Sequence, residues 1–208
     1  MTEPVAARGV GAARDVRLCV VGGSTVTGYG DPKALGWVGR VAARTPADQV
    51  DLTVYEPGVR GDTSSGVLAR WREECGRRWA AEADNRLVVA TGAGDPRAGI
   101  SLARTRLNLA NVLDDATSEG LQPFVVGPAP TADRSTHDAT RTVTDAQRDV
   151  CSRRGIPFVD CFEPLLQHDQ WYADLEAGDG VHPGQAGYGL LAWLVLHGGW
   201  ARWLDVEV

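Results

Sequence analysis

The chain has 208 residues, of which 43% are hydrophobic and 23% charged, as in ordinary globular proteins. A chain of this length can bury a full core, and we expect one domain over residues 16–208. The formal net charge of −6 argues against a nucleic-acid partner, which would need a basic surface.

Residues 1–15 are rich in Ala and Gly but lack an apolar segment, so they predict a flexible N-terminal arm rather than a signal peptide. The longest apolar run, residues 190–196, is too short to cross a membrane. The cysteines show neither zinc spacing nor a disulfide framework. They are Cys19, Cys75, Cys151 and Cys161. We therefore expect a cytoplasmic protein with free thiols and no membrane partner.

Short apolar runs alternate with helical patterns along the chain. Five runs predict strands, at Val16–Val21, Val50–Tyr55, Leu87–Thr91, Pro123–Val126 and Pro157–Asp160. Apolar side chains at helical spacing predict helices around residues 35–42, 67–79, 102–116 and 143–150, and a last helix that starts at His182. This alternation predicts an α/β fold with a five-stranded, mostly parallel sheet flanked by helices.

In such a sheet, ligands bind beyond the carboxyl ends of the strands, so the loops after the strands should carry the function. These loops are residues 22–30, 58–65, 92–99, 127–137 and the segment before the last helix. An Arg-rich stretch, residues 70–78, falls within a helical pattern instead. Because Glu73 and Glu74 interrupt it, we interpret it as a solvated helix face.

Ser24 and His182 are candidates for nucleophilic catalysis. Ser24 follows an apolar strand and two glycines, a setting in which a tight turn can expose its hydroxyl group. His182 could accept the hydroxyl proton, and Asp179, three residues earlier, could orient the imidazole. Taken alone, Ser24 also suits a helix N-cap, and the Asp179–His182 pair also suits the start of the last helix.

Further segments fall between these two ends in a fixed order. The five loop segments are Gly22-Gly23-Ser24, Gly58-Val59-Arg60-Gly61-Asp62, Gly92-Ala93-Gly94-Asp95, Gly127-Pro128-Ala129-Pro130 and Asp179-Gly180-Val181-His182. Together they resemble the motifs of the SGNH (GDSL-like) hydrolase superfamily, over residues 16–196. The resemblance implies a flavodoxin-like, three-layer α/β fold and hydrolysis of an ester, thioester or acetyl group of a small molecule, without metal or cofactor.

The resemblance also implies the roles of individual residues. Ser24 would be the nucleophile, His182 the general base and then acid, and Asp179 its orienting partner. The backbone N–H groups of Ser24 and Gly61 would donate to the oxyanion, and Gly94 would complete the oxyanion hole.

Two glycines depart from the family pattern. Gly23 stands where the family usually has Asp, and Gly94 stands where it has the Asn that supplies the third oxyanion donor. If that donor is missing, we expect Gly94→Asn to raise activity on short esters modestly. Alternatively, Arg60 or Arg97 supplies the donor, or Gly94 makes room for a bulkier substrate. Both arginines could also line the substrate pocket.

Other residues near these motifs have plainer interpretations. Trp171 and Tyr172 could line an acyl or aromatic pocket, although core packing explains them equally well. We expect Asp62 and Ser64 to cap the following helix and Asp95 to be structural.

Three alternatives to a serine hydrolase remain open. A metal site made of Asp62, Asp95, Asp179 and His182 lacks ligand spacing. The same triad could transfer the acyl group to an alcohol or amine instead of water. Gly23 and Gly94, the two glycines that depart from the family pattern, also suit a binding protein on a decayed hydrolase fold. The sequence leaves the oligomeric state open.

Overall fold

A computed structural model describes residues 13–207 of the chain. Its strands are β1 (Arg14–Gly22), β2 (Val50–Tyr55), β3 (Asp84–Ala90), β4 (Gln122–Val126) and β5 (Phe158–Val159). Its α-helices are α1 (Gly36–Ala42), α2 (Ser64–Gly76), α3 (Leu102–Ser118), α4 (His137–Ser152), α5 (Asp169–Glu176), α6 (Gln185–Val195) and α7 (Ala201–Leu204). A 3₁₀ turn (Arg134–Thr136) precedes α4, and a π-helical turn (Leu196–Trp200) joins α6 to α7. Across this range, no helix combines the length and apolarity that a membrane crossing would require.

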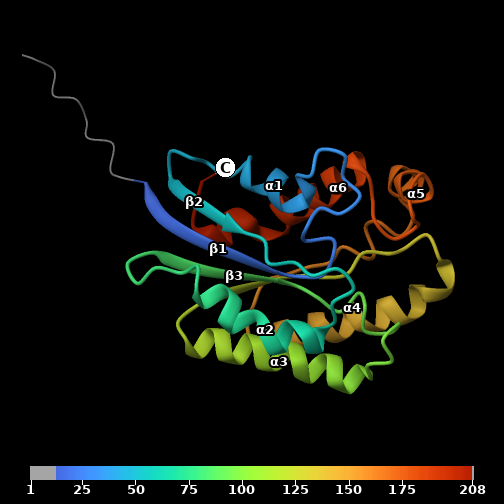
Figure 1. The fold of residues 1–208 in the computed structure, drawn as a ribbon, viewed down its shortest axis with the longest axis horizontal. Coiled ribbons are helices and arrows are strands. Elements are labelled where there is room, and N and C mark those ends of the chain that lie inside the picture. Colours follow the sequence, from blue (N-terminus) through green and yellow to red (C-terminus); the bar gives the residue numbers. More distant parts are fainter. Residues whose placement is uncertain (1–12, 208) are drawn as a thin grey trace, which may run out of the picture.

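The five strands form one sheet in the order β2-β1-β3-β4-β5, and every neighbouring pair is parallel (Figure 1). Central strand β1 is buried on both faces, as is typical of parallel sheets covered by helices. Its side chains alternate between the two sides, with Leu18 and Val20 in one core and Cys19 and Val21 in the other.

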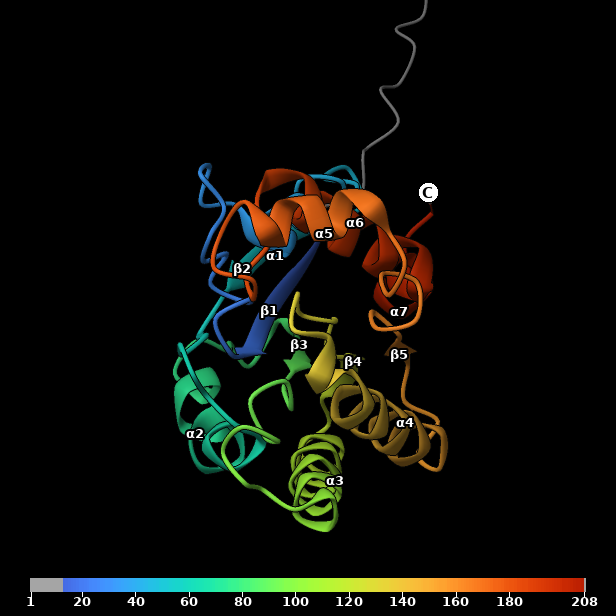
Figure 2. The ribbon, with the colours of Figure 1, turned by 90° about the vertical axis from the view of Figure 1, so that its right-hand side faces the viewer.

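Helices cover both faces of the sheet. Helices α1, α5, α6 and α7 lie on one side, and α2, α3 and α4 lie on the other (Figure 2). The core beneath α1 and α6 contains Trp37, Tyr188 and Leu191, whereas the core beneath α2 and α3 contains Trp71 and Leu109. The predicted three-layer, flavodoxin-like fold is therefore confirmed.

The ends of several elements differ from the sequence-based expectation. Strand β1 starts at Arg14, so residues 14 and 15 belong to the sheet rather than to the predicted arm. Residues 1–12 of that arm lie outside the described part. Helix α2 ends at Gly76, before Trp79, and α6 starts at Gln185 rather than at His182.

Helix α5 was not expected. It has only eight residues, and its apolar stripe consists of Trp171 and Leu175, one helical turn apart. A stripe of two residues is too short to stand out in the sequence. The helix matters because it carries Trp171 into the region near His182.

Candidate active site

The parallel strands bring the five loop segments to one edge of the sheet. Ser24 follows β1, Gly61 follows β2, and Gly94 follows β3. Pro128 follows β4, and His182 precedes α6. All five residues line a single cavity of about 430 Å³. Segments more than 150 residues apart in the sequence thus meet at this edge, as the strand pattern predicts.

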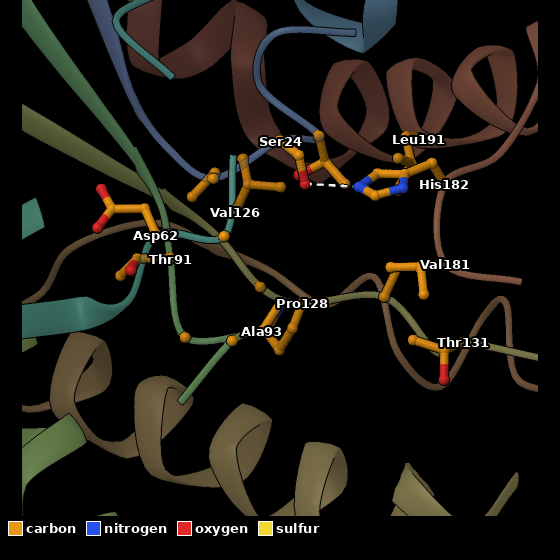
Figure 3. A pocket seen from close by; sticks show the side chains of 18 of the residues that line it. Ser24, Asp62, Thr91, Ala93, Val126, Pro128, Thr131, Val181, His182 and Leu191 are labelled. Carbon is orange, nitrogen blue, oxygen red and sulfur yellow. Dashed lines mark hydrogen bonds between the residues drawn. The ribbon is translucent and has the colours of Figure 1, made fainter. Parts of the chain in front are cut away.

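Ser24, His182 and Asp179 form a continuous chain of hydrogen bonds (Figure 3 shows its first link). Ser24 Oγ lies 2.6 Å from His182 Nε2. On the other side of the imidazole, His182 Nδ1 lies 2.7 Å from Asp179 Oδ2. These distances are those of a nucleophile, a base within hydrogen-bond reach and a carboxylate that fixes the imidazole.

The carboxylate of Asp179 is held in place by its own loop. Asp179 Oδ1 accepts the backbone N–H groups of Val181 at 2.9 Å and His182 at 2.8 Å. Partial burial pushes the pKa of Asp179 upward, but the hydrogen bonds from His182 and Val181 outweigh it and lower this pKa to about 2. Asp179 is therefore a carboxylate at neutral pH and can stabilise a protonated imidazole.

The first loop also contacts the imidazole through Tyr29. The Tyr29 ring meets the His182 ring edge-on, with ring centroids 4.7 Å apart. A Cβ at the next residue, Gly30, would lie only 3.1 Å from His182 Cβ, so glycine permits this close approach. Arg60 stacks over the Tyr29 ring, with its guanidinium carbon 3.6 Å from the ring centroid. Arg60 therefore supports Tyr29 and is not among the residues that line the cavity, contrary to the pocket role considered for it.

Three residues that line the cavity have backbone N–H groups available to a ligand. Within residues 13–207, the N–H groups of Ser24, Gly61 and Gly94 donate to no protein acceptor. Gly61 has φ +75°, a backbone conformation that favours glycine. Unpaired N–H groups beside a nucleophile suit the stabilisation of an oxyanion.

Gly23 and Gly94, the two glycines that depart from the family pattern, have different surroundings. A Cβ at Gly94 would lie 2.8 Å from the carbonyl oxygen of Asp62, so the space expected at this position is filled by backbone. A Cβ at Gly23 would meet nothing closer than 3.9 Å. An Asn at position 94 therefore cannot enter without moving the Gly61–Asp62 loop, and the expected gain from Gly94→Asn is not supported by the packing.

Apolar side chains form most of the cavity wall. They include Trp37, Val126, Trp171, Val181 and Leu191. Trp171 is buried, and its indole N–H donates to the carbonyl of Pro130, which fixes the ring against the wall. Arg97 also lines the cavity and has an exposed side chain. Tyr172 does not line it; its ring lies near that of His137, with centroids 6.4 Å apart.

The capping role expected for Asp62 and Ser64 is wrong. The N-cap of α2 is Thr63, whose extended backbone lets its hydroxyl accept the N–H of Gly66. Asp62 instead pairs with Arg70, and Figure 3 shows its carboxylate directed away from Ser24 and His182.

Asp95 connects the third loop to helices α2 and α3. This fully buried carboxylate accepts the N–H of Ser64 at 2.8 Å and the hydroxyl of Thr105 at 2.6 Å. Both oxygens are thus occupied by structural hydrogen bonds.

In the described part of the chain, no group of three or more His, Cys, Asp or Glu side chains is placed to hold a metal ion.

Arg70 and Tyr29 are site residues that the sequence analysis did not single out. The interpretation of residues 70–78 as a solvated face holds for Arg72 and Arg77 but not for Arg70, whose side chain is 17% exposed. A helix turns by about 100° per residue, so Arg70 and Arg72 point in nearly opposite directions. The position of Arg70 beside the buried stripe of Val67 and Trp71 was the available signal.

Comparison with known proteins places these features in a family. The sequence model of the GDSL-like Lipase/Acylhydrolase family matches residues 20–190. Esterase TesA from Pseudomonas aeruginosa is 31% identical over 110 residues, and the match spans about half the length of each protein, 53% in both cases.

Solved structures share the fold at lower identity. A mutant of Axe2, an acetyl-xylooligosaccharide esterase from Geobacillus stearothermophilus, superposes with a TM-score of 0.75 at 17% identity. The match covers 92% of this chain and 96% of that one. The psychrotrophic esterase EstA from Pseudoalteromonas superposes with a TM-score of 0.71 at 17% identity, over 91% and 98% of the two chains.

Proposed function

Since this chain belongs to the GDSL-like lipase/acylhydrolase family, we propose that it is a serine esterase that cleaves a small-molecule ester through an acyl-enzyme on Ser24. The observation that carries the proposal is the unbroken hydrogen-bonded chain from Ser24 through His182 to Asp179, of which Ser24 and His182 line a cavity. The relatives named as esterases support ester hydrolysis as the reaction.

Acylation follows from the geometry. His182 Nε2 takes the proton of the Ser24 hydroxyl as Oγ attacks the ester carbonyl, and a tetrahedral oxyanion forms. Asp179 stabilises the protonated imidazole through Nδ1. The N–H groups of Ser24 and Gly61 donate to the oxyanion, and the unpaired N–H of Gly94 is available as a third donor. Collapse of this intermediate releases the alcohol, which takes the proton from His182.

Deacylation repeats these steps with water. His182 removes a proton from the water as its oxygen attacks the acyl carbonyl on Ser24. The second tetrahedral intermediate then collapses, the proton returns to Ser24 Oγ, and the carboxylic acid leaves. If an alcohol or amine replaced water in this step, the same residues would transfer the acyl group instead.

The lining of the cavity indicates which part of the substrate it holds. Its wall beneath Ser24 is built mainly from apolar side chains, including the buried Trp37, Trp171 and Leu191. Burial of apolar surface favours binding by roughly 25 cal/mol per Å². We infer that the acyl group of the ester lies in this cavity and that the alcohol portion faces solvent.

The nucleophile can be tested by substitution and by labelling. Ser24→Ala is expected to lower kcat for p-nitrophenyl acetate by at least about 10³-fold, because triad members act as a unit. His182→Ala should be about as damaging, and Asp179→Ala less so. A fluorophosphonate probe should give a single adduct on Ser24, measured by mass spectrometry of the intact protein.

Ser152→Ala is the matched control, because Ser152 is an exposed serine at the end of α4, remote from the cavity. It should keep both activity and labelling. If the wild-type protein neither hydrolyses the ester nor takes up the probe, the esterase proposal is wrong and a binding role becomes the better explanation.

A further inference from the structure

One guanidinium connects the loops that carry the nucleophile and the oxyanion donor. Arg70, on the second turn of α2, makes hydrogen bonds in several directions. Its Nη2 donates to the carbonyl of Gly22 at 3.0 Å, and its Nη1 donates to the carbonyl of Pro57 at 2.7 Å. Its Nε donates to the carboxylate of Asp62 at 2.8 Å, and Nη1 also donates to Glu74 at 2.9 Å.

Two of these partners, Gly22 and Asp62, are close in sequence to residues that the proposed mechanism uses. Gly22 ends β1, two residues before Ser24. Asp62 directly follows Gly61, the second proposed oxyanion donor. The carbonyl of Gly22 also accepts the N–H of Val59 at 3.0 Å, so the first two loops meet where Arg70 binds.

The position of the third loop, residues 92–95, depends on Asp62, which Arg70 binds. Gly94 packs against the carbonyl of Asp62, at a distance that leaves no room for a Cβ. The position of Asp62 therefore sets the approach of the 92–95 loop as well. No Asp side chain is available at Gly23 to support the nucleophile turn, whereas the Arg70 guanidinium binds the carbonyl of Gly22 at the start of this turn. Arg70 is not among the residues that line the cavity.

The interaction is largely shielded from water. The side chain of Arg70 is 17% exposed and that of Asp62 is 10% exposed. Arg72, two residues along the same helix, makes its ion pairs to Asp115 and Glu119 with a side chain that is 55% exposed. A shielded, charge-assisted contact holds its geometry more tightly than an exposed pair does.

We propose that Arg70, anchored by Asp62, is a positioning residue that holds the Ser24 turn and the Gly61 loop so that their N–H groups converge on one oxyanion. Arginine suits this role because its planar guanidinium donates in fixed directions from three separate nitrogens, whereas the donors of lysine rotate about a single nitrogen. The inference rests on the proposed esterase function. It predicts that the loss of Arg70 weakens transition-state stabilisation more than substrate binding.

The test compares Arg70→Met with Arg72→Met, which removes an arginine and its ion pairs from the same helix. We expect Arg70→Met to lower kcat per active site about 10- to 100-fold with KM nearly unchanged, less than the ~10²–10³-fold cost of losing one oxyanion donor outright. Labelling of Ser24 by a fluorophosphonate should slow in parallel, since it passes through a similar charged intermediate. Arg72→Met should stay within about twofold of wild type, as expected for an exposed ion pair.

Further readouts separate positioning from a general loss of stability. Active sites are counted by probe labelling, and kcat is measured well below the thermal midpoint of each variant. The midpoint of the pH profile of kcat/KM should not move in Arg70→Met, because Arg70 touches neither His182 nor Asp179. Arg70→Lys keeps the positive charge and the aliphatic part of the side chain, and its kcat should still be lower than that of wild type. If Arg70→Met does not fold, Arg70→Lys replaces it in the comparison with Arg72→Met.

The outcomes are distinct. If the wild type is active and kcat falls no further in the Arg70 variants than in Arg72→Met, the positioning role is overturned while the esterase proposal stands. A fall in kcat accompanied by an equal rise in KM, or by a shifted pH midpoint, also overturns it. A wild-type protein inert to both ester and probe overturns the esterase proposal and this inference together.

Discussion

The carbonyl oxygen of Asp62 occupies the direction in which a side chain at position 94 would have to grow. Within residues 13–207, the N–H of Gly94 donates to no protein acceptor, and Gly94 lines the same cavity as Ser24. The effect of a side chain at position 94 therefore depends on the position of Asp62, and the two residues should be considered together.

Gly94→Asn is expected to lower kcat/KM for p-nitrophenyl acetate by about tenfold or more, because the new Cβ must displace the Gly61–Asp62 backbone. Such overpacking typically costs about 1–3 kcal/mol of stability, so the thermal midpoint should fall as well. Gly94→Ala should show both effects, since the Cβ alone makes the contact.

Gly23→Ala is the matched control, because a Cβ there meets nothing within 3.8 Å and its nearest neighbour is the carbonyl of Val59 at 3.9 Å. It should leave activity and stability close to those of wild type. An increase in activity in Gly94→Asn would contradict this account and restore the view that a donor is missing.

At the level of elements, the cavity has a rigid wall and a loop wall. The rigid wall comes from Trp37 on α1, Trp171 on α5 and Leu191 on α6, all of which also belong to the core. The opposite wall includes Pro128 and Val181, which lie on the loops after β4 and before α6 (Figure 3). Substitutions in the loop wall can change the cavity with less disturbance of the core.

Val181→Trp is expected to narrow the cavity and to lower kcat/KM for p-nitrophenyl octanoate at least tenfold more than for p-nitrophenyl acetate. The backbone N–H that Val181 donates to Asp179 does not depend on the side chain, so the triad should be kept. Val181→Ala is the control, because it enlarges the cavity instead of narrowing it. It should not lower kcat/KM for the octanoate relative to the acetate. Equal losses on both esters in Val181→Trp would mean that the acyl chain does not lie here.

On the scale of the whole molecule, the two cores enclose all four cysteines. Each cysteine is free and fully buried, with Cys161 in the core beneath α6 and the other three in the opposite core. Burial raises the pKa of the Cys151 thiol to about 12, so very little reactive thiolate is present at neutral pH. The thiols should become reactive only when the fold opens.

Thiol titration with a chromogenic disulfide reagent should therefore give no rapid reaction in the native protein and four thiols in guanidinium chloride without reductant. A free cysteine in a solvent-accessible site would react with the reagent both in the native protein and in guanidinium chloride. An accessible thiol therefore serves as the control that the reagent works under both conditions. Only two reactive thiols after denaturation would show a disulfide and would count against the expected cytoplasmic location.

Local patterns in the sequence were enough to predict the strands, their parallel arrangement and the candidate catalytic residues. Strand and helix periodicity is a local property, so the strands around Val16–Val21 and Val50–Tyr55 and the parallel arrangement could be predicted from it. The parallel arrangement in turn placed Ser24 and the loop before α6 at one edge of the sheet. The family-like segments then predicted that Ser24, Asp179 and His182 would meet, and the structure brings these side chains together.

Other features were decided only by the tertiary structure, because they depend on distances between segments far apart in the chain. No local pattern shows that Gly94 is crowded by Asp62 while Gly23 is open, since both are single glycines in loops. Arg70 and Arg72 belong to one charged stretch, yet helix rotation and packing bury the first and expose the second. Sequence identifies which groups can react, whereas packing decides which backbone and side-chain groups hold them in the geometry that the reaction needs.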